Sequence, residues 1–260
     1  MYFFNVKLTI IIFMLLSQIS WAIPKNVNSL ESIKKLGVLT VCSQAGFIPF
    51  EYKNNKGEWQ GFDVDLMKAF SKYLGVKLQM IDTKMEGLIP SLQTGKCDFI
   101  ASGLTITEER KNAVLFSKPV HFATISAALL DNPENRKKYK IFSDIDKEGI
   151  KIASHTGSAA TLFLKDYLKN ANHLQFDTLS DQVSALIQKK VETFVDDDIF
   201  IREVSKEMKT KFYTIISNNQ GYIAMAARKE DDHLINKFNK FLDHFEKSDE
   251  YKLLKEFYFK

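Results

Sequence analysis

The sequence has no low-complexity segment and no stripe of basic residues. Its 36 Lys and Arg are well mixed with 32 Asp and Glu, for a formal net charge of +4, so a nucleic-acid-binding surface is not indicated. The absence of biased segments also argues against disorder. With 45% hydrophobic residues over 260 positions, we expect a globular protein with a substantial core in one or two domains.

Long apolar runs are missing beyond the N-terminus, where MYFFNVK carries one positive charge and LTIIIFMLL is apolar. This stretch is shorter than the ~20 residues that a membrane span needs. Ser20 and Ala22 supply small residues at the two cleavage-defining positions. We therefore expect a secretory signal peptide over 1–22, cleaved after Ala22, and an exported mature chain. That chain begins at Ile23 rather than Cys, so no lipid attachment site is expected.

Cysteine is scarce as well. Cys42 and Cys97 are the only two, and in an exported chain they are the only candidates for a disulfide. Whether they pair depends on where the fold places them.

The apolar pattern of the first half alternates between short strands and amphipathic helices. Apolar and β-branched runs predict strands over 38–42, 76–81 and 97–101, with helices that begin near Asp63 and Gly87. This order predicts a mostly parallel sheet with both faces covered. The second half repeats the pattern, since QVSALIQKKVETFVDD can be laid over LIPSLQTGKCDFIASG. We therefore expect two α/β lobes.

Polar loops follow the predicted strands of both halves, at 43–47, 102–107, 154–158 and 196–198. In open parallel sheets, ligands bind beyond the carboxyl ends of the strands, where the loops diverge. If the two lobes face one another, these loops line one cleft.

The loop SGLTITEER at 102–110 combines small residues, hydroxyls and one Arg. One interpretation is purely structural: Thr107 caps a helix that starts at Glu108, and Thr105 with Glu108 forms a capping box. Arg110 would then be solvated. The other interpretation is that hydroxyls, free backbone N–H groups and the planar guanidinium converge on a carboxylate.

The acids Asp196, Asp197 and Asp198 end the corresponding strand of the second half. Their spacing lacks the alternation of a calcium loop, and Asp198 is a candidate cap for the next helix. A carboxylate at this strand end can also accept hydrogen bonds from an ammonium group. Together with the Arg110 loop, it predicts a site for the zwitterionic head of an α-amino acid.

Other loop residues can complete this site. Phe47 can cover the ligand, and Thr156 and Gly157 can offer backbone N–H groups to its carboxylate. His155 is interpreted as a wall residue rather than a base, because no partner acid is placed for it.

The stretch from GFIPFEYKNNKGEWQGFDVDL to GLIPSLQTGKCDFIASGLTITEERKNAVLFSKPV resembles the periplasmic amino-acid-binding proteins of ABC importers, solute-binding protein family 3. KIASHTGSA, VDDD and AMAARKED match weaker segments of that family, so the resemblance covers nearly the whole mature chain. It implies a type II periplasmic-binding-protein-like α/β fold. Each lobe would be a mostly parallel sheet flanked by helices, and two crossover strands would form the hinge.

The family organisation also implies boundaries. Lobe 1 would comprise 23–120 plus 224–260, and lobe 2 would comprise 124–219, with hinges at about 120–124 and 219–223. The C-terminal segment would pack back onto lobe 1 through Leu253, Leu254 and Phe257.

The family sheet bears on the cysteines. The strands that hold Cys42 and Cys97 would be parallel neighbours, with Cys42 level with Ala101. Cys97 would then lie about 13 Å along the strand, beyond the ~7 Å between Cα atoms that a disulfide tolerates. Two free, buried thiols are expected.

In the family, the residues matching Arg110 and Thr105 and backbone groups matching Ser102, Gly103 and Gly157 hold the ligand carboxylate. The Asp matching Asp197 holds the ammonium, and an aromatic matching Phe47 stacks over the ligand. The ligand-binding residues expected for this chain are Gln44, Phe47, Met85, Ser102, Gly103, Thr105, Arg110, Thr156, Gly157 and Asp197.

Two positions depart from the family pattern. Gln44 stands where relatives that take basic or polar side chains often have an acid, and Met85 stands where Trp or Phe is frequent. The sequence therefore does not predict an arginine or histidine binder. Gln44 can hydrogen-bond an amide or carboxylate side chain, and Met85 offers a flexible apolar wall.

The resemblance implies a periplasmic receptor that binds a free amino acid, closes, and delivers it to an inner-membrane ABC permease. No catalytic residue, metal or cofactor is expected, and a monomer is expected. The main alternative is a periplasmic cyclohexadienyl or arogenate dehydratase on the same fold, whose chemistry needs a general acid. Glu86 and His155 are the candidates, and neither has an evident partner. A membrane sensor is a weaker alternative, since no signalling domain follows Lys260.

Overall fold

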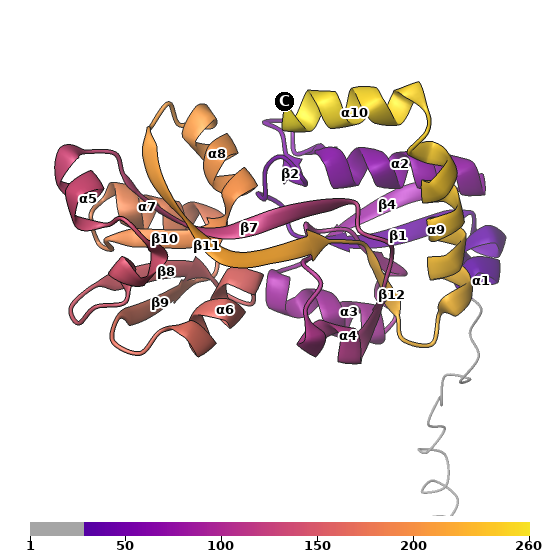
Figure 1. The fold of residues 1–260 in the computed structure, drawn as a ribbon. Helices are drawn as coiled ribbons and strands as arrows, with labels where there is room; N and C mark the ends of the chain where they lie inside the picture. The colour runs from indigo at the N-terminus through magenta and orange to yellow at the C-terminus, as the bar shows by residue number, and fades with distance from the viewer. Residues whose placement is uncertain (1–28) are drawn as a thin grey trace, which may run out of the picture.

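The computed structural model describes residues 29–260, so the expected signal peptide and its cleavage site lie outside the described residues. The chain forms two α/β lobes that lie side by side (Figure 1). Each lobe is built on a five-stranded sheet with helices packed on its faces. The expected two-lobed architecture is therefore confirmed.

The elements alternate between helix and strand along most of the chain. The helices are α1 (Ser29–Leu36), α2 (Phe62–Leu74), α3 (Leu88–Gln93), α4 (Glu108–Ala113), α5 (Pro133–Lys138), α6 (Ala159–Tyr167), α7 (Leu179–Ile187), α8 (Asp198–Glu207), α9 (Asp232–Phe245), α10 (Asp249–Phe259) and the short 3-10 helices η2 (Met85–Gly87) and η3 (Phe142–Ile145). The strands are β1 (Val38–Ser43), β2 (Tyr52–Lys53), β3 (Trp59–Gln60), β4 (Lys77–Asp82), β5 (Phe99–Ile100), β6 (Val114–Phe116), β7 (His121–Leu130), β8 (Lys151–His155), β9 (Asn172–Phe176), β10 (Thr193–Asp197), β11 (Phe212–Ile223) and β12 (Ala226–Arg228).

The first sheet has the strand order β4-β1-β5-β12-β6. Strand β1 pairs in parallel with β4 and β5, and β12 runs antiparallel to β5 and β6. The strands expected at 38–42 and 76–81 agree with β1 and β4 to within one residue at each end, whereas the one expected at 97–101 is reduced to β5. Helices α2 and α9 cover this sheet, where the ring centroids of Phe70 and Phe238 lie 5.0 Å apart in the core.

The second sheet has the order β11-β7-β10-β8-β9. Its strands β7 and β11 are long and connect the two lobes (Figure 1). They pair antiparallel, with a register shift between Ile216 and Gln220. Strand β7 follows β6 of the first sheet and β11 leads back into β12, so the chain passes between the lobes twice. These are the two crossover strands that the sequence implied.

Cys42 and Cys97 form a disulfide, with Cα atoms 5.7 Å apart, so the expectation of two free thiols is wrong. Cys42 pairs with Ile100 rather than Ala101, and β5 begins only at Phe99. Cys97 therefore lies before the strand, in the turn that follows α3. The estimate of about 13 Å assumed an extended strand from Cys97 onward, and the chain is not extended in that turn. Because α3 packs against β1, the turn brings the two sulfurs together.

The C-terminal helix α10 packs on α2 of the first lobe (Figure 1), but only one of the three expected residues makes the contact. Leu254 packs against the core, whereas Leu253 and Phe257 are 66% and 78% exposed. The other contacts come from Tyr251, which is buried, and from Tyr258, whose hydroxyl donates to Asp65 Oδ2 at 2.7 Å.

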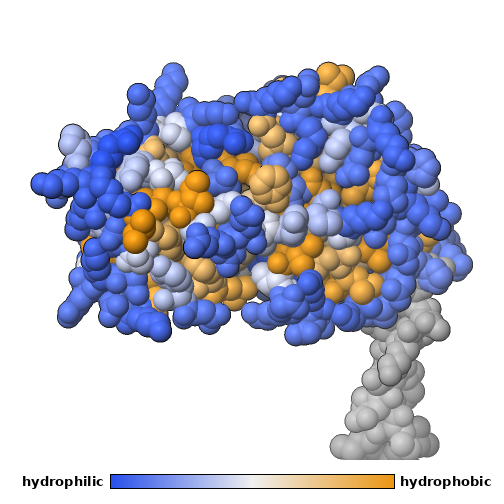
Figure 2. Space-filling model, in the orientation of Figure 1, coloured by the Kyte–Doolittle hydropathy of each residue, from blue (hydrophilic) through white to orange (hydrophobic). Residues whose placement is uncertain are grey.

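The outer surface is mixed. Figure 2 shows hydrophobic residues toward the middle of each lobe on the face seen in Figure 1, with hydrophilic residues around them. Within residues 29–260, no helix combines the length and hydropathy needed to cross a membrane.

Candidate ligand-binding site

The loops that leave β1, β5, β8 and β10 meet between the lobes, and seven of the ten predicted site residues line one cavity there. Its volume is about 20 Å³, roughly enough for one water molecule. The lobes are therefore closed on one another. The predicted residues in this lining are Gln44, Phe47, Met85, Ser102, Gly103, Thr105 and Asp197, and the others are Glu51, His155, Ser158, Ala159, Ala160, Leu179 and Asp196.

Arg110 does not line the cavity directly but lies behind it as a buried cation. Its side chain is 6% exposed, so the solvated alternative is wrong. Thr107 is the N-cap of α4, as expected, and its hydroxyl accepts from the Arg110 backbone N–H at 3.2 Å. Nη1 donates to the Thr105 carbonyl at 2.8 Å, and Nη2 donates to the Gly157 carbonyl at 2.9 Å. Because Gly157 belongs to the second lobe, this guanidinium joins the two lobes.

The charge of Arg110 is retained at neutral pH. Burial lowers the pKa of its guanidinium to about 10, and the negative charge of Asp197 acts in the opposite direction. A buried cation of this kind needs an anionic or carbonyl partner, and here the Thr105 and Gly157 carbonyls fill that role.

Two of the three consecutive acids at the end of β10 have hydrogen-bond partners within the protein. Asp196 accepts from Gln182 Nε2 at 2.5 Å and from the Asp197 N–H at 2.9 Å. Asp198 accepts from the Thr124 N–H at 2.8 Å, which holds the start of α8 against β7. The remaining side chain, that of Asp197, faces the cavity.

Asp197 is 6% exposed. Burial and the neighbouring charges of Asp196 and Asp198 raise the pKa of its carboxyl, while Arg110 lowers it. A cation placed beside it would remove that repulsion, so the carboxyl is suited to accept an ammonium group.

Ser102 and Gly103 follow β5, and the Ser102 hydroxyl and the Gly103 N–H are already engaged within the protein. The Ser102 hydroxyl donates to Glu51 Oε1 at 3.1 Å and accepts from the Gln44 N–H at 2.9 Å. The Gly103 N–H donates to Asp63 Oδ2 at 2.9 Å. The carbonyl oxygens of this turn can accept hydrogen bonds from a ligand.

The lack of a side chain at Gly103 leaves room for the Phe47 ring beside this turn. The φ of Gly103 is +49°, and a Cβ at this position would lie 2.5 Å from the Phe47 ring. Phe47 in turn stacks on Phe50 of its own lobe and on Phe200 of the other, with ring centroids 5.4 and 5.3 Å apart. The ring therefore forms an apolar wall that both lobes share.

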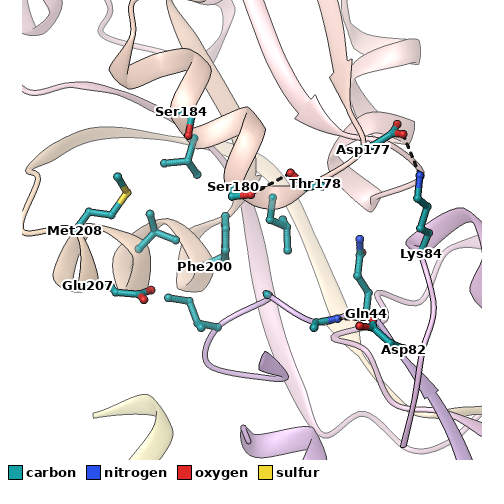
Figure 3. Close-up of a pocket in the computed structure, with 16 residues that line it drawn as sticks. Gln44, Asp82, Lys84, Asp177, Thr178, Ser180, Ser184, Phe200, Glu207 and Met208 are labelled. Atoms are coloured by element: carbon teal, nitrogen blue, oxygen red, sulfur yellow. Dashed lines mark hydrogen bonds and ion pairs between the residues drawn. The ribbon is translucent and has the colours of Figure 1, made fainter. Parts of the chain in front are cut away.

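Two further polar contacts cross the cleft. The Gln44 amide donates to Nε2 of His155 at 3.0 Å, and burial lowers the pKa of that imidazole, which keeps it a neutral acceptor. At the rim, Lys84 Nζ pairs with Asp177 Oδ2 at 3.1 Å (Figure 3). Thr156, another predicted site residue, lies beside this rim and donates to Asp177 rather than facing the cavity.

Glu51 is the main site residue that the sequence analysis missed. It is fully buried and lines the cavity, and its Oε2 has no hydrogen-bond partner within the described part of the chain. Burial and the charge of Asp63 raise the pKa of its carboxyl well above the usual range. The available signal was a single acid between Phe50 and Tyr52 in an otherwise apolar segment. Across residues 29–260, no group of three or more His, Cys, Asp or Glu is arranged to hold a metal ion.

A larger groove of about 580 Å³ opens beside the cavity (Figure 3). It lies between the lobes, with Gln44 and Lys84 on one side and residues of α7 and α8 on the other.

Comparison with known proteins places most of the described chain in one group. The family model for bacterial extracellular solute-binding proteins, family 3, matches residues 39–260. A probable histidine-binding protein of Neisseria gonorrhoeae is 30% identical, over 82% of this chain and 80% of that protein. An L-arginine-binding protein of Pseudomonas aeruginosa is 26% identical, over 92% and 94%. A cyclohexadienyl dehydratase of the same species is 27% identical, over 69% and 66%.

Solved structures agree. An ancestral amino-acid-binding protein, described as a precursor of cyclohexadienyl dehydratase, superposes with a TM-score of 0.83 at 33% identity, over 90% of this chain and all of that one. An arginine-binding protein variant of T. maritima superposes with a TM-score of 0.81 at 32% identity, over 89% and 99%. The fold is therefore that of the type II periplasmic binding proteins.

Proposed function

The chain belongs to family 3 of the bacterial extracellular solute-binding proteins, and we propose that it captures a free amino acid between its lobes and delivers it to an inner-membrane ABC permease. The observation that carries the proposal is the placement of Arg110 and Asp197. These two buried groups come from different lobes and act electrostatically on one another; Asp197 lines the cavity and Arg110 lies behind it. In this proposal the signal peptide is removed after Ala22 and the mature chain acts in the periplasm.

The head group of an α-amino acid fits the polarity of this site. Its carboxylate takes the place of the carbonyl partners of Arg110, whose fork can hold both oxygens. Its ammonium group lies between the Asp197 carboxylate and the carbonyl of Gly103, whose own N–H is engaged by Asp63. Thr105, which lines the cavity, supplies a hydroxyl close to Arg110.

The same division of contacts explains why a bound ligand would favour closure of the two lobes. Arg110 of the first lobe holds the carboxylate and Asp197 of the second lobe holds the ammonium, so only the closed state makes both contacts, and ligand shifts the equilibrium toward it. We take the lobes as 23–120 with 224–260, and 124–219, hinged at about 120–124 and 219–223. Since the cavity in this structure has room for about one water, the lobes must open for an amino acid to enter and then close on it less tightly than they do here.

A thermal-shift screen tests this function. The purified mature protein is heated with each of the twenty amino acids, cystine, ornithine and prephenate. A ligand at 100 times its dissociation constant stabilises the folded state by about 2.7 kcal/mol, a rise in Tm of about 5–10 °C for a chain of this size. At least one amino acid should produce such a rise. If none does, the proposal is wrong.

A dehydratase is the alternative function, because one relative is named a cyclohexadienyl dehydratase and one solved structure is described as an amino-acid-binding precursor of that enzyme. It requires a proton donor at the substrate. His155 is a neutral, buried imidazole bonded to Gln44, which suits a wall residue better than an acid. Incubation with prephenate and measurement of released carbon dioxide separates the two functions, since a receptor leaves prephenate unchanged.

A further inference from the structure

The 580 Å³ groove lies directly beside the closed cavity. Gln44 and Leu179 line both spaces, so the groove is the continuation of the cavity on that side. Figure 3 shows the groove with Gln44 on its wall. On the opposite side, a hollow of about 510 Å³ shares Thr105, Ala159 and Asp197 with the cavity. Thr105 and Asp197 face the head group in the proposed function, on which this inference rests. The side chain of the ligand therefore points away from them, toward Gln44 and the groove.

One wall of the groove is apolar. Phe200, Val204 and Met208 recur every fourth residue along α8 and its C-terminal end, so they form one stripe. At 1.5 Å per residue, that stripe is about 12 Å long. Ile48 and Leu179 add apolar surface at the end nearest the cavity. A chain of methylene groups would be buried against this wall.

The charges of the groove are unbalanced. It contains three acids, Asp82, Asp177 and Glu207, and one base, Lys84. Asp82 is paired with Lys53 at 2.6 Å and Asp177 with Lys84 at 3.1 Å. Glu207, at the far end of the stripe, has no ion-pair partner within residues 29–260. The groove therefore carries one uncompensated negative charge beyond its apolar wall.

We propose that the ligand is an α-amino acid with a long apolar stem and a cationic end. The stem leaves the closed cavity past Gln44 and lies along the stripe of α8, and the cation faces Glu207. From Asp198 to Glu207 the helix rises about 14 Å, so longer side chains approach this carboxylate more closely. Relatives that take basic side chains often have an acid at the position of Gln44. In this chain, Glu207 of the second lobe supplies an acid at a greater distance from the head group.

Calorimetric titration with two matched ligand pairs tests the inference. L-Lysine is one methylene longer than L-ornithine, and L-homoarginine is one longer than L-arginine. A methylene buried against the stripe contributes about 0.8 kcal/mol, so the longer member of each pair should bind about fourfold more tightly. Glu207→Gln should weaken L-homoarginine about two- to fivefold, the range of an exposed ion pair, and should leave L-glutamine unaffected.

Glu203→Gln is the matched control. Glu203 lies one turn earlier on α8 but pairs with Arg202 and Lys206 at 2.8 and 2.9 Å and does not line the groove. Its substitution should leave all four affinities unchanged. Equal binding within each pair, or the same loss in both variants, would overturn the inference. Binding of neutral amino acids alone would overturn it while leaving the proposed function intact, whereas binding of no amino acid would overturn both.

Discussion

Arg110 is a buried cation whose two hydrogen bonds reach Thr105 in its own lobe and Gly157 in the other. Arg110→Ala should lower affinity for the bound amino acid by about 2–5 kcal/mol, because a buried charge pair loses one partner. Arg110→Lys should recover only part of this, since an ammonium lacks the planar fork. Isothermal titration measures both.

An exposed arginine of the second lobe serves as the control for this prediction. Arg136 pairs with Asp131 and is 56% exposed in its side chain, so Arg136→Ala should bind ligand like the wild type. If Arg110→Ala binds equally well, the guanidinium does not hold the ligand.

The carboxyl of Asp63 should make stability depend on pH. Burial raises its pKa from the ordinary 3.8 to about 7. Between these values the folded protein retains a proton that the unfolded chain has lost, so stability falls as pH rises through this window. Asn at this position can still accept from the Gly103 N–H, but it does not titrate. The Tm of Asp63→Asn relative to wild type should therefore increase from pH 4 to pH 7.

Asp249→Asn is the control, because the Asp249 side chain is 91% exposed on α10. Its Tm difference from wild type should be nearly constant over the same range. A pH-independent difference for Asp63→Asn would mean that Asp63 is ionised in the folded state throughout.

At the residue scale, the sequence predicted two charged residues that the structure buries near the cavity, but not the acids behind Ser102 and Gly103. Arg110 and Asp197 follow strands with recognisable polar loops, so their convergence could be predicted. Glu51 accepts a hydrogen bond from Ser102, which lies 51 residues away in the sequence. Asp63 accepts one from Gly103, which lies 40 residues away. No local pattern reports such a contact, and the family resemblance implied that the backbone of Gly103 holds the ligand carboxylate.

Strand β5 shows where prediction of elements fails. The apolar run at 97–101 reads as a full strand, but only Phe99 and Ile100 pair with neighbours. The residues before them turn toward α3, which carries Cys97 to Cys42. The predicted strand began two residues too early, and this error was enough to make the prediction of two free thiols wrong.

Removal of this disulfide should destabilise the first lobe. It spans a sequence separation of 55 residues, for which the loop-closure model gives about 4 kcal/mol. Cys42→Ala/Cys97→Ala should unfold at correspondingly lower urea concentration than the oxidised wild type. Reductant should lower the stability of the wild type toward that of the variant and leave the variant unchanged. Two reactive thiols in the denatured, unreduced wild type would show that no disulfide forms.

Helix α10 shows a second limit of predicting elements from the sequence, namely which face of a helix is buried. Its sequence offers two apolar stripes, one through Tyr251, Leu254 and Tyr258 and one through Leu253 and Phe257. Periodicity alone does not decide between them. The first stripe faces the core in the structure, because Tyr258 also finds Asp65 on α2, and the second is left exposed.

At the scale of the whole molecule, closure brings backbone into contact across the cleft. Gly157 has φ of +76°, and a Cβ there would lie 3.3 Å from the backbone N of Glu86 in the other lobe. Gly157→Val should therefore keep the lobes apart. Small-angle scattering with ligand should give a larger radius of gyration for this variant than for the wild type.

Gly149→Val separates this effect from backbone strain. Gly149 has a similar φ of +81°, but a Cβ there would meet nothing within 4 Å. This variant should lose stability yet close with ligand like the wild type. If Gly157→Val closes equally well, the contact with Glu86 does not limit closure.

The two-lobed fold itself was predictable, because each half carries its own strand and helix periods. The degree of closure was not, since it depends on contacts such as Gln44 with His155 that join residues 111 positions apart. The sequence therefore predicts a cleft, and the structure shows how tightly its walls can meet.

The central claim is that one lobe holds the carboxylate of an amino acid and the other holds its ammonium group. The most direct test titrates the best amino acid from the thermal-shift screen, and its deaminated analogue, into wild type and Asp197→Asn. The account predicts that Asp197→Asn weakens the amino acid much more than the analogue, because only the former presents an ammonium group to this carboxylate. Equal loss for both ligands would contradict it.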